Sequence, residues 1–363
     1  MSTQPTRFQL RRRRVAAALA NQQIDVLLVT HLLHVRYLAG FSGSNGALTI
    51  AADEQASIAT DGRYTTQIAE EVPDIEAVNA RAVATHLLAE IAGPATVGYE
   101  ADYVTVSELE RLKEAAGEGV VLVPVRGVIE EIRLRKDAYE LSRLDEVAEI
   151  ANSAFRELVD EGLIRAGRKE FEIAADLEYK MRMKGAEKPS FDTIVASGPN
   201  SAKPHHGAAD RVVEHGDIVT IDFGAHLLGY NSDTTRTVIV GEADAFSTEI
   251  YNIVLEAQLA GCRAAVPGAT LQDVDKACRD IITEAGYGEY FVHSTGHGVG
   301  LDLHEPPYAA TTGQGVLEEN MTVTIEPGIY VPGKGGVRIE DTLVVTTGEP
   351  LNLTRIPKEL RIV

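Results

Sequence analysis

Hydrophobic and polar positions in the first third of the chain follow the patterns of alternating helices and strands. Apolar residues at helical spacing and short apolar runs predict a helix near residues 6–22 and strands at 25–30, 46–50 and 56–60. This alternation is typical of a small α/β domain. Near residues 126–140 the pattern becomes that of a long amphipathic helix, so we place a domain boundary at about residue 130.

Residues 131–363 contain an internal repeat. Each copy has two helices separated by a glycine, then one strand, then a pair of strands. The first copy predicts helices at 137–162 and 169–184, a strand at 191–198 and a strand pair at 217–240; the second predicts helices at 245–264 and 270–285, a strand at 291–298 and a strand pair at 321–346. Two such halves indicate one pseudo-symmetric domain of the α+β class with a cleft between the halves.

Composition supports two cores, since the chain has 363 residues of which 44% are apolar. Cys262 and Cys278 lie on predicted consecutive helices outside any Cys-x-x-Cys pair, which indicates core thiols in a reducing compartment. The alanine-rich run after Arg11–Arg14 ends too early for a secretory segment, and no apolar run is long enough to cross a membrane. These features predict a cytoplasmic protein without a membrane partner.

The net charge of −20 argues against nucleic acid as a partner, because a strongly acidic surface repels phosphates. The basic run Arg11–Arg14 is therefore interpreted as a solvated helix face.

Acidic residues occur in pairs on the polar faces of the predicted strand pairs. Asp222 alternates with apolar residues on the first strand of its pair, and Asp233 lies on the second strand. A turn centred between Leu227 and Leu228 would place the two aspartates directly opposite, with Cβ atoms about 4.5–5.5 Å apart. Like charges at this distance are unfavourable unless a cation lies between them.

The second half repeats this arrangement around the turn at 332–336. With Gly333 at the centre of the turn, Glu326 and Glu340 become cross-strand partners. His297, from the glycine-flanked segment GHGVG, adds an imidazole to the four carboxylates. This donor set is suited to two divalent ions that share bridging carboxylates. The two ions in such sites lie about 3.5–4 Å from each other. Oxygen-rich ligands favour Mn²⁺ or Co²⁺, with Zn²⁺ as an alternative.

The alternative is that these acids are ordinary surface residues, which the 54 acidic side chains of the chain make reasonable for any single one. Two matched acid pairs, each on the polar face of a hairpin, would carry an electrostatic cost without a cation. The joint pattern therefore favours a metal site.

Three segments carry a resemblance to a known family: IDFGAHLLGYNSDTTRT at 221–237, STGHGVGLDLHEPP at 294–307 and IEPGIYVPGKGGVRIED at 325–341. In residues, order and spacing they resemble the pita-bread metallopeptidases, especially the proline-directed branch of aminopeptidase P and prolidase. The segments YLAGFSGSNGAL and ATDGRYTTQ resemble the noncatalytic domain shared by prolidases and creatinases. The resemblance implies a small α/β creatinase-like domain at 1–130 and a pseudo-symmetric pita-bread catalytic domain at 131–363.

The resemblance also assigns roles to individual residues. The implied metal ligands are Asp222, Asp233, His297, Glu326 and Glu340. Glu326 resembles the family's proton shuttle for the water that bridges the metals. His205 and His304 match the two histidines that contact substrate and stabilise the tetrahedral intermediate. A homodimer is implied as well, in which the amino-terminal domain of one subunit borders the cleft of the other.

Four further residues are given supporting or structural roles. Arg338 shares a strand face with Glu340 and is a candidate to hold a ligand carboxylate or the end of the substrate. Thr235 is a candidate to hydrogen-bond a ligand. Tyr230 and His206 are interpreted as packing and structural residues.

The sequence thus predicts a dinuclear-metal Xaa-Pro aminopeptidase, which acts on peptides with proline at the second position. The alternative is a strict Xaa-Pro dipeptidase. Tyr308 stands where many prolidases have an arginine that holds the free carboxylate of a dipeptide, and this favours the aminopeptidase.

Two other functions fit the sequence less well. Creatinase-like hydrolases share the fold but work without metals and have lost the acid ligands, all of which are present here. A noncatalytic pita-bread binding module typically breaks the ligand set and carries long charged tails, and this sequence has neither feature.

Overall fold

The computed structural model describes residues 5–363, which divide into two compact units with the division between Arg133 and Leu134. Each unit has strands and helices of its own, with one sheet in the first unit and several smaller sheets in the second. All the predicted metal ligands belong to the second unit.

The first unit is built on a mixed six-stranded sheet in the order β4-β3-β2-β1-β5-β6. Its strands are β1 (Val26–Val29), β2 (Gly46–Ala51), β3 (Ala56–Thr60), β4 (Ala77–Asn79), β5 (Ala95–Glu100) and β6 (Val120–Val125). The pairs β1–β2 and β2–β3 are antiparallel and the other three are parallel. Leu27 and Leu28 are both buried although successive strand residues point to opposite faces, so both faces of the sheet are covered.

The helices of the first unit are α1 (Arg7–Asn21), α2 (Leu32–Ala39), α3 (Thr65–Glu71), α4 (Val83–Ala89) and α5 (Val106–Ala115), with the 3₁₀ turn η1 (Gly62–Tyr64) before α3. Helix α1 begins after Thr6, which forms a capping box with Gln9. The predicted helix at 6–22 and the strands at 25–30, 46–50 and 56–60 are confirmed.

The interpretation of the basic run as a solvated face is wrong for two of its four arginines. Arg11 and Arg12 are buried, and they donate hydrogen bonds to the main-chain oxygens of Tyr37 and Leu38, both at 2.9 Å. These carbonyls lie in the last turn of α2, where cations are favourable. The side chains of Arg11 and Arg12 therefore connect α1 to α2.

The expected long helix at 126–140 is two helices. Helix α6 (Val128–Leu134) ends before Asp137, and α7 (Ala138–Asp160) begins directly after it. The Asp137 side chain accepts from the amide of Glu140, whose side chain accepts from the amide of Asp137. This capping box starts a new helix inside a continuous amphipathic pattern.

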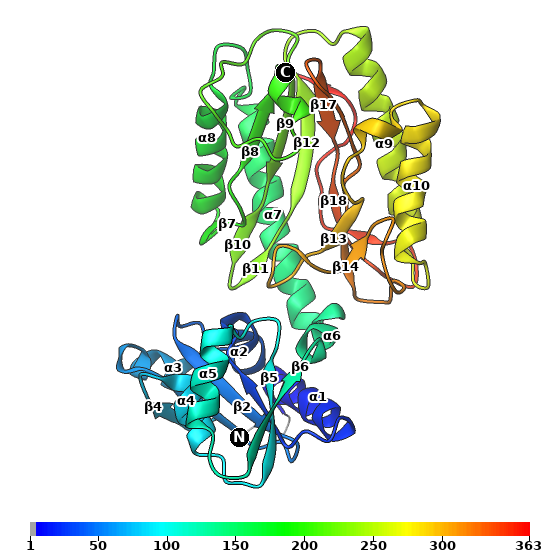
Figure 1. Ribbon diagram of the computed structural model, residues 1–363. Coiled ribbons are helices and arrows are strands. Elements are labelled where there is room, and N and C mark those ends of the chain that lie inside the picture. The colour runs from blue at the N-terminus through cyan, green and yellow to red at the C-terminus, as the bar shows by residue number, and fades with distance from the viewer. Residues whose placement is uncertain (1–4) are drawn as a thin grey trace. The chain divides into compact units, whose positions relative to one another are not determined.

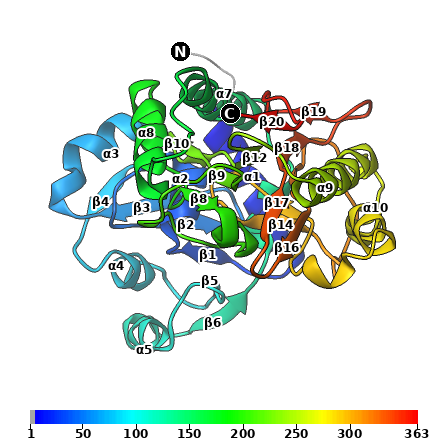
Figure 2. The ribbon, with the colours of Figure 1, turned by 90° about the horizontal axis from the view of Figure 1, so that it is seen from above.

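The second unit has the two-fold repeat of helices that the sequence predicts. Its helices are α7, α8 (Glu170–Met183), α9 (Ala245–Ala264) and α10 (Leu271–Glu284), with the 3₁₀ turns η2 (Gly198–Ala202) and η3 (Gly288–Tyr290). Within this unit, α8 lies on one side of the strands and α9 and α10 on the other (Figures 1 and 2).

The strands of the first half are β7 (Lys188–Pro189), β8 (Ile194–Ser197), β9 (Ile218–Phe223), β10 (Ala225–Leu227), β11 (Tyr230–Asn231) and β12 (Thr234–Ile239). Those of the second half are β13 (Gly296–Gly298), β14 (Glu305–Ala309), β15 (Thr322–Ile325), β16 (Gly328–Val331), β17 (Gly335–Arg338), β18 (Asp341–Val344), β19 (Leu351–Asn352) and β20 (Arg361–Ile362). Strands β9 and β12 form the long antiparallel pair of the first half, and β15 and β18 form that of the second.

The register of the first pair differs from the prediction. Asp222 is paired with Thr235 rather than with Asp233. The turn is centred between Leu228 and Gly229, which both have positive φ, 52° and 90°. A two-residue turn of this kind matches the twist of a hairpin. Moving the turn by one residue shifts the pairing by two, which preserves the face of every side chain.

The register of the second pair agrees with the prediction. Gly328 pairs with Arg338 in β16–β17, and Ile325 pairs with Asp341 in β15–β18. Glu326 and Glu340 lie at matching positions in the interruption between these two ladders. Glu326 and Glu340 are therefore not paired in either ladder.

The two cysteines lie on neighbouring helices, Cys262 on α9 and Cys278 on α10, and neither forms a disulfide. Burial raises the pKa of each thiol to about 12. A Cβ at Gly261 would lie 2.3 Å from the Cys278 sulfur, so this glycine permits the close approach of the helices. Thiols this basic are poor nucleophiles and act as packing groups.

Candidate metal centre

The five predicted ligands come from both halves of the second unit and converge. Asp222 is on β9, Asp233 directly precedes β12, His297 is on β13, Glu326 directly follows β15 and Glu340 directly precedes β18. Three overlapping groups have ligand atoms within 4.8 Å of one another: Asp233, His297 and His304; His297, Glu326 and Glu340; and Asp222, Asp233 and Glu340. The structure thus brings the whole predicted set together, and it adds His304 at one edge.

His297 is oriented as a metal ligand. Its Nδ1 is 3.0 Å from the carbonyl oxygen of Gly298, and because a carbonyl can only accept, Nδ1 carries the hydrogen. Nε2 then faces the carboxylates of Asp233 at 3.5 Å and Glu326 at 3.3 Å. A lone pair directed at two carboxylates is repulsive unless a proton or a metal ion lies between them.

The pKa values of His297 and Glu326 also indicate that a positive charge stabilises this cluster. Burial lowers the pKa of His297, but the hydrogen bond to Glu326 and the charges of Glu326 and Asp233 outweigh it and raise that pKa to about 9. Burial also opposes ionisation of Glu326, yet the bond to His297 and its charge bring the pKa of Glu326 to about 2. A proton on His297 therefore occupies the place that a metal ion would take.

The remaining carboxylates repel one another. Burial, reinforced by the charge of Asp222, raises the pKa of Asp233 well above its usual value, and burial with the charge of Asp233 does the same for Glu340. Within the described residues, Asp222 Oδ1 and Glu340 Oε1 are buried oxygens without a hydrogen-bond partner. Unpartnered buried carboxylate oxygens are costly, and a divalent cation would satisfy both.

Two neighbouring residues fix the orientation of the acids. Thr235 Oγ1 donates to Glu340 Oε2 at 2.7 Å. Arg338 Nη2 donates to Asp222 Oδ2 at 2.7 Å, and its Nε donates to Thr235 Oγ1 at 3.0 Å. Arg338 thus contacts the carboxylate of a predicted ligand, one of the two contacts considered from the sequence. In this arrangement the outward oxygens of Asp222 and Glu340 stay available for metal.

The cluster lies in a cavity of about 500 Å³. His205 and His304 line this cavity and are exposed to solvent, with the ring of His304 4.3 Å from the ring of His297. Phe191, Ile194 and Leu303 contribute apolar surface. A small apolar group and a reactive carbonyl can therefore be bound next to the acids and the two histidines.

Sequence reasoning missed two residues of the site, His293 and Tyr330. His293 lines the cavity, and its Nε2 is 2.8 Å from the hydroxyl of Tyr330, which also accepts from Arg338 at 2.8 Å. The available signal was that His293 lies four residues before His297 in FVHSTGHG. No pattern in the sequence identified Tyr330, because its contacts depend on how the strands are packed.

His206 and Tyr230 have structural environments. The imidazole Nε2 of His206 is 2.8 Å from Oε2 of Glu170, which is fully buried on α8. Tyr230 is buried and donates to Glu140 on α7 at 3.3 Å. Both are absent from the lining of the cavity, as the packing and structural interpretation expected.

None of the helices in the described part of the chain combines the length and the apolarity that a membrane span requires.

Comparisons with known proteins extend over nearly the whole chain. The model of the Creatinase/Prolidase N-terminal domain matches residues 11–135, and that of Metallopeptidase family M24 matches residues 142–347. The Xaa-Pro dipeptidase of Pyrococcus furiosus is 40% identical over 337 residues, which cover 93% of this chain and 95% of that relative.

Solved structures agree with these matches. The Xaa-Pro dipeptidase from Bacillus anthracis is 43% identical with a TM-score of 0.93, over 98% of this chain and 100% of that one. The X-Pro aminopeptidase from Thermotoga maritima is 37% identical with a TM-score of 0.88, over 97% and 99%. M24 peptidases are hydrolases that depend on a dinuclear metal centre, and the residues of the cluster described above fit such a centre. The match to the family model, the similarity of fold and the acid cluster agree with one another. The chain belongs to Metallopeptidase family M24.

Proposed function

We propose that this protein is a dinuclear-metal peptidase that hydrolyses the bond between an amino-terminal residue and proline, and that its main substrates are Xaa-Pro dipeptides. The observation that carries the proposal is the convergence of four carboxylates and His297 in a cavity that His205 and His304 also line. The names of the relatives favour the dipeptidase over the aminopeptidase that we expected.

The aminopeptidase remains the second candidate. It is supported by the Thermotoga relative and by Tyr308, which takes the place of the arginine expected in many prolidases. Tyr308 is 46% exposed and is paired with His297 between β14 and β13. Its hydroxyl can accept or donate a hydrogen bond, but it offers no charge to a free carboxylate.

Two divalent cations, for which we propose Mn²⁺ with Co²⁺ or Zn²⁺ as alternatives, would be held by Asp222, Asp233, His297, Glu326 and Glu340. When bound, such ions supply a hydroxide nucleophile at neutral pH and polarise the scissile carbonyl.

The side chains of the cavity perform the remaining steps. Glu326 takes up the proton of the attacking water and passes it to the proline nitrogen, which has no hydrogen of its own. His205 and His304 donate hydrogen bonds to the oxygen that becomes negatively charged. Arg338 keeps Asp222 in place through the bond at 2.7 Å.

Hydrolysis of Ala-Pro and of Ala-Pro-Ala-Ala, compared at one Mn²⁺ concentration, tests the proposal. We expect a higher kcat/KM for Ala-Pro, with Asp233→Ala as the inactive control. Preference for the tetrapeptide would favour the aminopeptidase. Failure to cleave either peptide in protein that has bound metal would refute the proposed function.

A further inference from the structure

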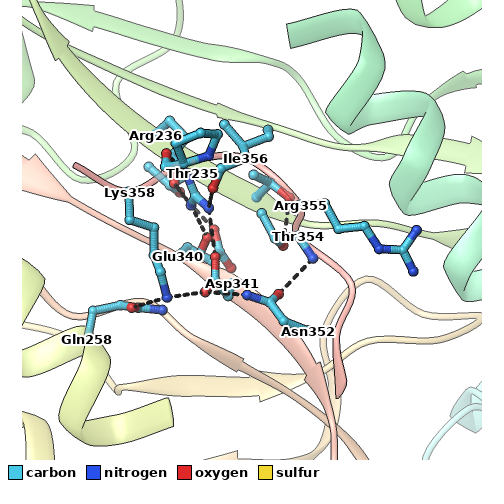
Figure 3. Close-up of polar contacts among 12 residues, drawn as sticks. Thr235, Arg236, Gln258, Glu340, Asp341, Asn352, Thr354, Arg355, Ile356 and Lys358 are labelled. Carbon is cyan, nitrogen blue, oxygen red and sulfur yellow. Dashed lines mark hydrogen bonds and ion pairs between the residues drawn. The ribbon is translucent and has the colours of Figure 1, made fainter. Parts of the chain in front are cut away.

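A buried charge network lies beside the predicted ligand Glu340 (Figure 3). Asp341 is fully buried and accepts from Arg236 Nη2 at 2.8 Å and from Lys358 Nζ at 2.6 Å. Asn352 Nδ2 donates to the same carboxylate at 2.8 Å. Two cations and one amide thus surround a single buried anion, so each partner of Asp341 matters for its charge balance.

The network reaches Glu340 through its main chain. Glu340 precedes β18, and its amide donates to the carbonyl of Thr235 at 3.1 Å instead of to a neighbouring strand of the β15–β18 ladder. Arg236 Nη1 donates to the carbonyl oxygen of Glu340 at 2.5 Å. Together with the bond from Thr235 Oγ1 to the Glu340 side chain, both peptide groups and the carboxylate of this ligand are held from β12.

The network also includes the C-terminal segment, defined as residues 352–358. Arg236 donates to the main-chain oxygens of Ile356 at 2.7 Å and Pro357 at 3.1 Å, so this segment supplies acceptors for the guanidinium as well as Lys358 for Asp341. Lys358 is held in turn by Gln258 on α9, at 2.9 Å. The C-terminal segment lies beyond residue 347, where the match to the M24 family model ends.

We propose that Lys358 and Asn352 of the C-terminal segment are part of the metal-binding apparatus, because they hold Asp341, and Asp341 holds Arg236, so that Glu340 is positioned to bind metal. Arg236, Asp341, Asn352 and Lys358 do not line the cavity, so we treat them as positioning residues. The proposal rests on Glu340 as a ligand and is independent of the peptide that the protein cleaves. Loss of a residue that orients a ligand typically weakens metal binding by about 10- to 100-fold.

The chain offers a matched control for the test. Arg355 lies in the same segment and carries the same charge as Lys358, but it makes surface ion pairs with Asp145 and Glu149. Lys358→Gln and Arg355→Gln therefore remove one positive charge each from neighbouring positions, and only the first removes a partner of Asp341.

The measurement is the Mn²⁺ affinity of the folded protein, obtained by competition with a chelator, together with the melting temperature of the metal-free protein. We expect Lys358→Gln to weaken Mn²⁺ binding about 10-fold or more, Lys358→Arg to restore much of the loss, and Arg355→Gln to stay within about twofold of the unchanged protein. Because binding is measured without peptide, the result does not depend on the proposed substrate.

A purely structural network gives a different result. Lys358→Gln would then lower the melting temperature of the metal-free protein while leaving the Mn²⁺ affinity of the folded protein unchanged, and this outcome overturns the proposal. If Lys358→Gln does not fold, Asn352→Ala is the deciding variant, since it removes the hydrogen bond to Asp341 and the one from the Thr354 amide without removing charge. Unchanged Mn²⁺ affinity in Asn352→Ala would equally overturn the proposal.

Discussion

At the scale of single residues, the site is organised by unsatisfied negative charge. His297 has its Nε2 between two carboxylates, and buried oxygens of Asp222 and Glu340 have no hydrogen-bond partner within the described residues. Each of these arrangements is unfavourable by itself. Together they are favourable only around cations, which makes metal content the most direct measurement of each predicted ligand's role.

Asp233→Ala is expected to abolish activity and to reduce the metal content to one ion per chain or none. Asp233 belongs to two of the three ligand groups, so its loss would remove a carboxylate that offsets the mutual repulsion of two cations. The measurement is elemental analysis of purified protein, with circular dichroism to show that the fold persists. Two metals per chain with near-normal turnover would contradict the assignment.

His304→Ala separates a substrate-contacting histidine from a ligand. A ligand atom of His304 lies within 4.8 Å of those of Asp233 and His297, but the side chain of His304 is exposed in the cavity. We expect metal content to be unchanged and kcat to fall by about 10²–10³, the usual loss for one donor to an oxyanion. Loss of metal from this variant would instead make His304 a ligand.

At the scale of elements, hairpin turns set the strand register that places the acids on one face of each hairpin. In the first hairpin the turn contains Leu228 at φ 52°, a conformation that is unfavourable for leucine. The side chain of Leu228 is 41% exposed, so it gains little from packing. The turn thus contains local strain while the strands beside it keep the register that brings Asp222 and Asp233 together.

Leu228→Asn is expected to stabilise the metal-free protein by about 1 kcal/mol, because Asn-Gly is the preferred sequence for this two-residue turn. Leu228→Ala is the control, since alanine gains nothing in the left-handed conformation. Urea unfolding gives both free energies of unfolding. A Leu228→Asn protein no more stable than Leu228→Ala would show that the turn is not a source of strain.

At the scale of the whole molecule, the two halves of the second unit must be assembled before the site exists. Asp222 and Asp233 come from the first half, and His297, Glu326 and Glu340 from the second. Apolar residues of the cavity wall come from both halves too, Ile194 from the first and Leu303 from the second. Substrate selection is therefore a property of the assembled cavity.

Replacing Ala-Pro by Ala-Ala should reduce kcat/KM severely, with a larger effect on kcat than on KM. The proline ring fixes the backbone path and aligns the carbonyl, and orientation of this kind can contribute several kcal/mol to lowering the barrier. Steady-state kinetics at fixed Mn²⁺ report the two parameters separately. Equal efficiency on both dipeptides would indicate a general dipeptidase with the same metal site.

The sequence by itself determined the helices of the repeat, the repeat itself and the identity of the clustered acids. Helical and strand periodicities are local, so the helices at 137–162 and 245–264 were readable without knowledge of their partners. Alternation along a strand fixes which face carries an acid, and this face survives a register shift of two residues. For that reason Asp222 and Asp233 were brought together although their predicted pairing was wrong.

Only the tertiary structure decided the features that depend on distant segments. Arg11 and Arg12 are buried because the end of α2, about 26 residues further along the chain, supplies acceptors for them. Arg236 contacts main-chain oxygens more than one hundred residues away, at Glu340 and Ile356. Hydrogen bonds between such distant residues leave no periodic signal along the chain, since they arise only when the fold satisfies buried polar groups.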